Sequence, residues 1–563
     1  MHIVLLFCLL LGFTPVTRAQ LMPPTRAEAL QAMRKAAGFY SKKVSREGGY
    51  HFHYTSDLTY GRSEQTEGLS RVEVQREATP MAAMAYLDAF AATSEPLFLE
   101  AAKASAQALV RGQICSGGWD YFIEFDPVER VKFPYRADGR CSDGMAKPGV
   151  TTLDDNVSQA ALRVLMRVDR ELKFEDKAIH DAALFALERL MAVQYPIGAW
   201  PQRFERPADF SKFPVKQASY PESWPWKWPG ADYRHHYTFN DNSISDMIDA
   251  MLEAARIYRN PRYLAAAEKG GEFILRAQMP DPQPAWAQQY DANMQPAWAR
   301  QFEPPSVTGG ESIGIMRTLM LLYSETGNRK YLDPIRRALD YLKASVLARK
   351  DAEVFRRIPE EEPVLARFYE LRSNRPLYVT KGMMLNASGL GSRRPDGYEL
   401  SYSPDSVITH YGVLVSGRGL AELERDYTAL LQANSQSLRR SDRLTGLSPW
   451  SQRLYVAGEP NRRPVSADAV RRIIDALDDR GAWTRTGSIG KADKVVSVFA
   501  AKEMVLRIRR GRSAKAETIP IHENDTVELF QGEEQPPERI ITTADFAQNL
   551  AILGRYVLQL PSQ

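Results

Sequence analysis

Four acidic residues stand where a polar loop gives way to a helix, a position from which carboxylates can do chemistry. Asp154, Asp155, Asp241 and Glu311 each precede or open a segment whose apolar residues recur at helical spacing. Loops on the same side of successive helices converge, so we expect these carboxylates at one mouth of the fold. Such a group suits a hard cation with oxygen ligands or general acid–base catalysis. The alternative is that each acid only caps its own helix.

The segment from Ser223 to Gly230 is a second candidate, because it holds three tryptophans in five positions. Trp224, Trp226 and Trp228 alternate with proline or lysine, so the segment cannot form a helix face. Exposed rings could stack on sugars, or the indoles could cover an edge of the core. HExxH, Walker and dinucleotide-binding motifs do not occur in the sequence. Their absence argues against zinc proteases, NTPases and Rossmann enzymes.

A repeated pattern indicates which elements position these residues. A small residue followed by an aromatic one recurs, and the first four aromatic residues are 69, 81 and 86 positions apart. Each interval has room for two helices and a long loop, and a ring of such hairpins gives every apolar face a neighbour. We therefore predict an all-α fold, an α/α toroid with long loops at one mouth. The pairs are Gly49-Tyr50, Gly118-Trp119, Ala199-Trp200, Ala285-Trp286 and Ala482-Trp483.

The chain is expected to have three parts. Residues 1–19 are interpreted as a signal peptide, because the apolar run 3–13 precedes Thr17-Arg18-Ala19, whose small residues suit a cleavage site after Ala19. Residues 20–425 are predicted to form the toroid, which is the catalytic domain. Residues 426–563 form a C-terminal extension, either a further repeat that closes the toroid or a small separate domain. Its best strand candidates are residues 495–498 and 504–508.

Composition and cysteine content limit the cellular compartments and the binding partners that we expect. The net charge of the 563 residues is only +4 and both signs are mixed along the chain, so nucleic acid is not an expected partner. No later stretch approaches the roughly 20 apolar residues of a spanning helix, so we expect a secreted or periplasmic protein without a membrane anchor. After loss of Cys8, Cys115 and Cys141 could form one disulfide or remain as two buried thiols.

Five segments match, in order along the chain, the motifs of one enzyme family. They are Thr152–Asp155 with Arg163 (TIDN…R), Gly198–Phe204 (GGWPQ), Tyr237–Asn242 (TFNDD), Trp286–Arg317 (WCAQHD…ARAYELPSLSGSESVGI) and Arg367–Tyr378 (RFYEIGTNRPIF). Together they resemble the pectate lyases of polysaccharide lyase family ten. The resemblance covers about residues 151–398, under half of the chain, and the shared order makes it specific.

The resemblance implies a calcium-dependent enzyme that cleaves polygalacturonate, an acidic polysaccharide, by β-elimination. Asp154 and Asp241 would hold calcium, and Arg375 would remove the proton at C5 of a galacturonate unit. Calcium would neutralise the uronate carboxylate and stabilise the charge that develops as the proton leaves. Arg300 is the next candidate for this step. The residues expected to contact substrate are Trp200, Gln202, Arg203, Asn240, Arg300, Glu303, Glu311 and Trp226.

The sequence also departs from the family pattern. Ala199 replaces a glycine, Asn242 replaces the second aspartate of NDD, and Asp155 stands where the family has asparagine. Residues 287–291 differ from CAQHD, and the long C-terminal part is additional. The proposed calcium and base residues are retained, so lyase chemistry is expected to survive more easily than strict specificity for polygalacturonate.

Two other functions fit the same residues. A glycoside hydrolase on the same fold could use Asp154 and Asp241 as acid and base, with the separation of the carboxyl groups setting the stereochemistry. A non-catalytic exported carbohydrate-binding protein could use the segment from Trp224 to Trp228. A lyase leaves an unsaturated product, a hydrolase leaves a saturated reducing end, and a binding protein leaves the polymer intact.

Overall fold

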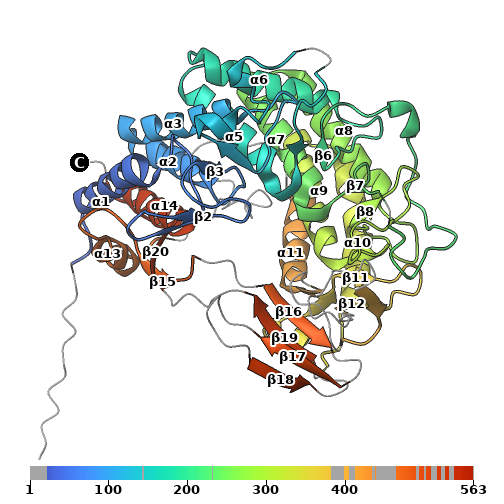
Figure 1. Ribbon diagram of the computed structural model, residues 1–563. Helices are drawn as coiled ribbons and strands as arrows, with labels where there is room; N and C mark the ends of the chain where they lie inside the picture. The colour runs from blue at the N-terminus through green and yellow to red at the C-terminus, as the bar shows by residue number, and fades with distance from the viewer. Residues whose placement is uncertain are drawn as a thin grey trace, which may run out of the picture.

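The computed structural model of this protein (Figure 1) describes most of the chain. The described residues are 22–142, 145–230, 232–350, 352–381, 398–404, 413–433, 438, 464–489, 494–499, 503–508, 517–521, 526–531 and 538–561. The predicted signal peptide, residues 1–19, lies outside them. Within the described ranges, no helix combines the length and the apolar character needed to cross a bilayer.

Inner and outer helices alternate and form the arc seen in Figure 1. The inner helices pack side by side in the order α14 (Thr543–Gln559), α2 (Thr79–Thr93), α5 (Val157–Glu171), α7 (Ser243–Tyr258), α9 (Gly309–Thr326) and α11 (Arg418–Gln432). The outer helices that pack on them are α1 (Arg26–Phe39), α3 (Pro96–Gly112), α6 (Lys177–Ala192), α8 (Pro261–Ala277) and α10 (Asp333–Ala344). The prediction of an α/α toroid built from helical hairpins is confirmed.

The turns between paired helices follow from local sequence. Asn260 accepts a hydrogen bond from the backbone N–H of Arg262 at 3.0 Å, and Pro261 occupies the first turn of α8, where no backbone donor is needed. Asp176 caps α6 in the same way through the N–H of Ile179 at 3.2 Å. These caps end one helix and start the next within a few residues, so the two helices lie antiparallel.

The repeated tryptophans hold each hairpin to the loop that follows it. Trp119, Trp200 and Trp286 are at most 1% exposed. Their indole N–H groups donate to backbone carbonyls in the last turns of the preceding outer helices, where intrahelical partners run out. The acceptors are Leu109 O at 2.8 Å, Leu190 O at 2.9 Å and Ile274 O at 2.9 Å, and Trp483 reaches Ile473 O at 2.8 Å. At Gly118 a Cβ would clash with Thr151 Cγ2, so glycine lets this loop pack closely against β5 (Thr151–Thr152).

Very short strands fasten the loops that lead into the inner helices. Strand β5 (Thr151–Thr152) pairs antiparallel with β6 (Arg203–Phe204), and β7 (Tyr237–Thr238) pairs with β8 (Gln289–Tyr290). The other strands near the helices are β1 (His53–Thr55), β2 (Gly61–Arg62), β3 (Arg71–Glu73), β4 (Phe122–Glu124), β9 (Val307–Thr308), β10 (Val364–Ala366), β11 (Phe368–Tyr369), β12 (Pro376–Lys381), β13 (Tyr398–Ser401), β14 (Leu414–Ser416), β15 (Arg485–Gly487) and β20 (Glu538–Thr542).

The stretch after residue 426 contains both helix and strand. Strand β16 (Lys494–Phe499) pairs with β19 (Thr526–Gln531), and β17 (Met504–Ile508) pairs with β18 (Glu517–Ile521), below the arc in Figure 1. The predicted strands at 495–498 and 504–508 are therefore present. Helix α14 packs against α1 and α2, and α13 (Ala467–Asp475) packs against α1 and α14, so the two ends of the chain share one helical layer.

Helices α5 and α7 are joined by buried ion pairs as well as by apolar contacts. Arg163 pairs with Asp249 and, at 3.5 Å, with Glu253, while Arg167 pairs with Glu253. All four residues are at most 9% exposed. Removing one partner of such a pair would leave an uncompensated buried charge, which is strongly destabilising.

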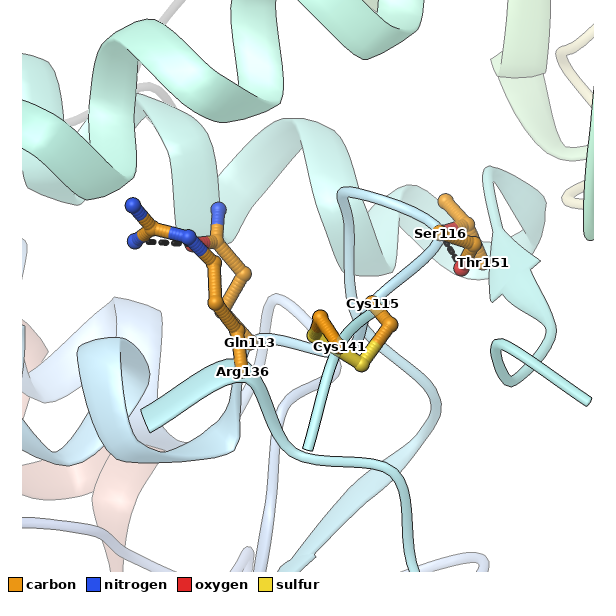
Figure 2. The surroundings of a disulfide bond; sticks show 6 residues. All are labelled: Gln113, Cys115, Ser116, Arg136, Cys141 and Thr151. Carbon is orange, nitrogen blue, oxygen red and sulfur yellow. Dashed lines mark hydrogen bonds between the residues drawn. A yellow bond between two sulfur atoms is a disulfide. The ribbon is translucent and has the colours of Figure 1, made fainter. Parts of the chain in front are cut away.

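Cys115 and Cys141 form a disulfide (Figure 2). Cys115 lies beside Ser116, whose hydroxyl is 2.7 Å from the Thr151 hydroxyl and whose N–H donates to Pro148 O at 3.0 Å. The disulfide therefore fastens the loop that leads to β5. In the chain-entropy account, closing a loop of 26 residues contributes on the order of 3 kcal/mol.

The carboxyl group of Glu73 is buried and accepts hydrogen bonds from neutral groups. Glu73, at the end of β3, is 0% exposed and accepts hydrogen bonds from Thr66 Oγ1 at 3.0 Å and Gln65 N–H at 3.3 Å. Desolvation and the nearby charges of Glu64 and Asp120 raise the pKa of Glu73 to about 8, against hydrogen bonding that lowers it. Its ordinary value is 4.5.

Replacement of Glu73 by glutamine should stabilise the protein at alkaline pH. Between pH 4.5 and about 8 the folded state holds a proton on Glu73 that the unfolded chain releases. Stability from this group is therefore complete below pH 4.5 and falls by up to about 1.4 kcal/mol per pH unit until the pKa near 8 is passed. The melting temperature of Glu73→Gln should match wild type near pH 5 and exceed it by roughly 4 °C at pH 9. Glu124→Gln, which removes the 2.6 Å pair with Arg71, should instead lower it. A gain for Glu73→Gln that does not vary with pH would contradict the charge argument.

Candidate functional site

Two consecutive inner helices begin with the same unusual turn. The one-turn 3-10 helices η3 (Asp154–Asn156) and η5 (Asn240–Asn242) precede α5 and α7 and lie side by side. Asp155 and Asn156 have φ angles of 49° and 56°, and Asp241 and Asn242 have φ angles of 50° and 58°. Aspartate and asparagine tolerate this left-handed region better than other non-glycine residues. By repeat position Asp155 is the counterpart of Asp241, and Asp154 is the counterpart of Asn240.

The twin turns bring three carboxylates together. One carboxylate oxygen each of Asp154, Asp155 and Asp241 lie within 4.8 Å of one another. Desolvation and the charges of Asp154 and Asp155 raise the pKa of Asp241 to about 7, although the residue is exposed overall. Desolvation, Asp154 and Glu64 likewise raise the pKa of Asp155 to about 6. Because both pKa values are raised, an additional positive charge nearby would stabilise the ionised form of the cluster.

The donor set fits a hard divalent cation. Carboxylate oxygens are the preferred ligands of such ions, and here three of them converge from two helix starts. Next to Asp155, the side-chain oxygen of Asn156 is buried and has no hydrogen-bond partner in the described part of the chain. Asp154, Asp155 and Asp241 are therefore the residues that could hold a metal. The predicted pair Asp154 and Asp241 lies in this group.

The neighbours of Asp154 orient its two oxygens separately. Gln202 Nε2 donates to Oδ1 at 2.9 Å, and the Tyr121 hydroxyl lies 3.2 Å from Oδ2. Arg203 donates to the Tyr121 hydroxyl at 3.0 Å and lies 3.8 Å from Asp154 Oδ2. Two residues expected from the sequence, Gln202 and Arg203, thus contact the acidic cluster directly or through one tyrosine.

A second group of charged residues surrounds Asn240. Arg367, which lies between β10 and β11, donates at 3.0 Å to Asn240 Oδ1 and Glu311 Oε1. The same guanidinium donates to Gln288 Oε1 at 3.0 Å, and Gln288 in turn donates to Glu303 at 2.7 Å. Glu303 is 2% exposed and receives both a 2.9 Å and a 2.8 Å hydrogen bond from Arg300. The charges of Arg367 and Arg300 lower the pKa of Asp241, against the larger effects that raise it.

Asn240, Arg300 and Glu303 line a cleft of about 700 Å³. It contains one member of the acidic cluster, Asp154, and several basic side chains, which suits an anionic ligand. The lining residues include Val150, Asp154, Tyr195, Gln202, Arg203, Phe204, Glu205, Arg206, Tyr233, Arg234, His235, His236, Thr238, Asn240, Gln289, Ala299, Arg300 and Glu303.

The tryptophan-rich segment divides into supporting rings and one exposed ring. Trp228 donates its indole N–H to Ala299 O at 2.8 Å, next to Arg300 in the cleft wall, and Trp224 is partly buried against the core. Trp226 is 38% exposed. Its ring centroid lies 5.4 Å from Trp224 and 5.3 Å from Tyr402. Trp224 and Trp228 therefore pack against other residues, and Trp226 is the exposed ring of the three.

The remaining predicted residues lie in different surroundings. Arg375 is exposed, and its guanidinium carbon lies 3.4 Å from the centroid of the Tyr402 ring, beside Trp226. Trp200 is 1% exposed and fully engaged in the fold by its hydrogen bond to Leu190 O. Trp200 therefore packs inside the fold and does not line the cleft.

Sequence reasoning missed several residues of the site. Arg367, Gln288, Tyr121 and Gln75 were not among the expected site residues, although the first two lie in segments that carry the family resemblance. Arg367 is the arginine of the Arg-Phe-Tyr-Glu segment, which was one available signal. Tyr121 occupies the position two residues after Trp119, as Gln202 and Gln288 do after Trp200 and Trp286.

Comparison with known proteins gives an independent result. Residues 134–406 match the family model described as pectic acid lyase, which confirms the resemblance inferred from the sequence. None of the curated proteins compared with the chain matches it significantly.

Solved structures that match part of the chain include three enzymes. A family 10 polysaccharide lyase from Cellvibrio cellulosa is 20% identical, with a TM-score of 0.41, over 63% of this chain and 98% of its own. A D-mannose isomerase is 13% identical, with a TM-score of 0.37, over 61% and 74%. A cellobiose 2-epimerase from Spirochaeta thermophila is 15% identical, with a TM-score of 0.36, over 57% and 69%.

The acidic cluster should destabilise the protein when divalent cations are removed. At pH 7.5 in chelator, Asp155→Asn should raise the melting temperature by roughly 2 °C, because it removes one of three mutually repelling carboxylates and keeps a residue that tolerates positive φ. Asp479→Asn, an exposed site outside the cluster, should have little effect. A fall in the melting temperature for Asp155→Asn would show that repulsion does not dominate.

Proposed function

We propose that this protein is a secreted, calcium-dependent polysaccharide lyase that cleaves pectate or a related uronate polymer by β-elimination. The match of residues 134–406 to the pectic acid lyase family carries the proposal. The carboxylate cluster beside a cleft with several arginines supports it, because an anionic polymer and a hard cation would both find partners there. Export would depend on residues 1–19, the proposed signal peptide.

The reaction needs a group that acidifies the C5 proton of a uronate. Asp154 and Asp241 are the proposed calcium residues, and bound calcium would neutralise the substrate carboxylate next to C5. As a base takes the C5 proton, the C5–H electron pair forms the C4=C5 double bond and the C4–O bond to the next sugar breaks. Gln202 and Tyr121 keep the Asp154 carboxylate in place during this step, since each engages a different oxygen.

An arginine is the proposed base, with two candidates in different positions. The resemblance assigns the step to Arg375, which lies on the Tyr402 ring beside the exposed Trp226. Arg300 is the second candidate because it lines the cleft together with Asp154. Its guanidinium is engaged with the Glu303 carboxylate by two hydrogen bonds, at 2.9 and 2.8 Å, which favours its charged form. That contact supports Arg300 as a group that binds negative charge, and the resemblance makes Arg375 the first candidate for the base.

A spectrophotometric assay on polygalacturonate tests the proposal. The wild-type protein should release a product that absorbs in the ultraviolet, and a chelator should abolish the signal until calcium is restored. Asp154→Ala and Asp241→Ala should each lose this activity with unchanged helical content. Reducing ends without ultraviolet absorbance would indicate a hydrolase, and an intact polymer would indicate a binding protein.

Conservative replacements distinguish the roles of Arg375 and Arg300. Arg375→Lys should lower kcat by at least about 10³-fold with little change in KM, because lysine moves the nitrogen and loses the planar fork. Arg300→Lys should mainly raise KM. Arg206→Lys, an exposed residue of the same cleft, is the control and should leave both constants nearly unchanged. An Arg375→Lys enzyme with more than a tenth of wild-type kcat would exclude it as the base and transfer the assignment to Arg300.

Trp226 should affect long substrates more than short ones. If its exposed ring stacks on a sugar, burying on the order of 60 Å² of apolar surface is worth about 1.5 kcal/mol. Trp226→Ala should then raise KM for the polymer about tenfold and leave KM for a trisaccharide nearly unchanged. Phe174→Ala, another exposed aromatic residue at 42%, is the matched control. Equal changes for both substrate lengths would contradict a stacking role.

A further inference from the structure

Two residues that contact the acidic cluster precede the segment that matches the family. The match begins at residue 134, whereas Gln75 and Tyr121 come from the paired strands before it. Gln75 follows β3 and Tyr121 precedes β4, and Val74 N–H donates to Tyr121 O at 2.7 Å. One small sheet therefore delivers both side chains to the cluster.

Both side chains contact Asp155. Gln75 Nε2 donates to Asp155 Oδ2 at 3.1 Å and to Glu64 Oε2 at 3.1 Å. The Tyr121 hydroxyl lies 3.2 Å from Asp155 Oδ2 as well as from Asp154 Oδ2. Because Arg203 donates to that hydroxyl, its own hydrogen remains for a carboxylate. Both contacts engage the same oxygen of Asp155, and its Oδ1 accepts no hydrogen bond from the residues that the structure describes.

The amide of Gln75 points to a polar ligand nearby. Gln75 is 2% exposed, and its Oε1 is buried without a hydrogen-bond partner in the described part of the chain. Asn156, which follows Asp155, is 7% exposed and its Oδ1 is unpartnered in the same sense. Buried acceptors without donors are costly, and a bound cation with its water molecules would supply partners.

Asp155 also occupies a position equivalent to that of a proposed calcium residue. It has the same left-handed backbone as Asp241 and lies at the same point of the preceding inner helix start. The family has asparagine here, so this chain adds a negative charge at that position. Three carboxylates instead of two would strengthen attraction to a divalent cation, provided that their mutual repulsion is held in check by fixed donors.

We infer that Asp155 is a third carboxylate ligand of the cation site and that Gln75 and Tyr121 are the positioning residues that hold it there. The inference rests on the proposed function for the presence of the cation. It makes the segment before residue 134 part of the site, although that segment lies outside the family match.

Calorimetric titration of the full-length, metal-free protein with calcium chloride, without substrate, tests this inference. Asp155→Asn should weaken calcium binding at least tenfold, and Gln75→Leu and Tyr121→Phe should each weaken it about tenfold, as removal of outer partners usually does. Gln278→Leu is the control, because Gln278 also donates to two acceptors, Pro284 O at 2.9 Å and Pro334 O at 3.0 Å, in another hairpin. Its calcium affinity should equal that of wild type.

Activity distinguishes positioning from a general loss of structure. The lyase activity of Gln75→Leu should be restored to wild-type kcat by raised calcium, which would not repair a misfolded protein. If wild type binds calcium and the calcium affinity of Asp155→Asn is within twofold of that of wild type, this inference is overturned and the proposed function stands. If wild type binds no calcium, both are overturned.

Discussion

The close approach of three carboxylates is the constraint on which the rest of the site depends. Like charges whose oxygens lie within 4.8 Å repel, so the fold has to hold them there. It does so with left-handed turns at two helix starts and with donors fixed from other segments, such as Gln202 and Tyr121. Arg367 and Arg300 add positive charge on the side of Asp241. The site is thus arranged to receive a cation and an anion together.

The scaffold can hold these carboxylates together because the hairpins that end in α3, α6 and α8 are closed in the same way. An indole N–H satisfies a carbonyl at the end of an outer helix, as between Trp200 and Leu190 at 2.9 Å, and a two-residue strand pair then sets the loop. The loop arrives at the inner helix start in one conformation. Because successive hairpins repeat this arrangement, the starts of α5 and α7 lie next to each other with the same geometry.

Sequence patterns predicted the elements better than the contacts between them. The apolar spacing and the Asn-Pro turn at 260–261 are local signals, so the hairpins and the junction positions of Asp154 and Asp241 could be predicted. Arg367 lies 127 positions from Asn240, and its role appears only when β10 packs against α9 and β11 pairs with β9. Trp200 and Trp226 are alike as residue types, yet one is buried and the other exposed, because burial depends on which neighbours the loops bring.

The ion pairs between α5 and α7 set the register of the acidic site. Arg167 and Glu253 are 86 positions apart, and the same interval separates Arg163 from Asp249 and Asp155 from Asp241. If α5 slid past α7 by one turn, one arginine or one carboxylate would be left buried without its partner, at a cost of several kcal/mol. Intermediate shifts would break both pairs. The two helices therefore have discrete relative positions. The carboxylates at their N-terminal ends meet only in the position in which both ion pairs are formed.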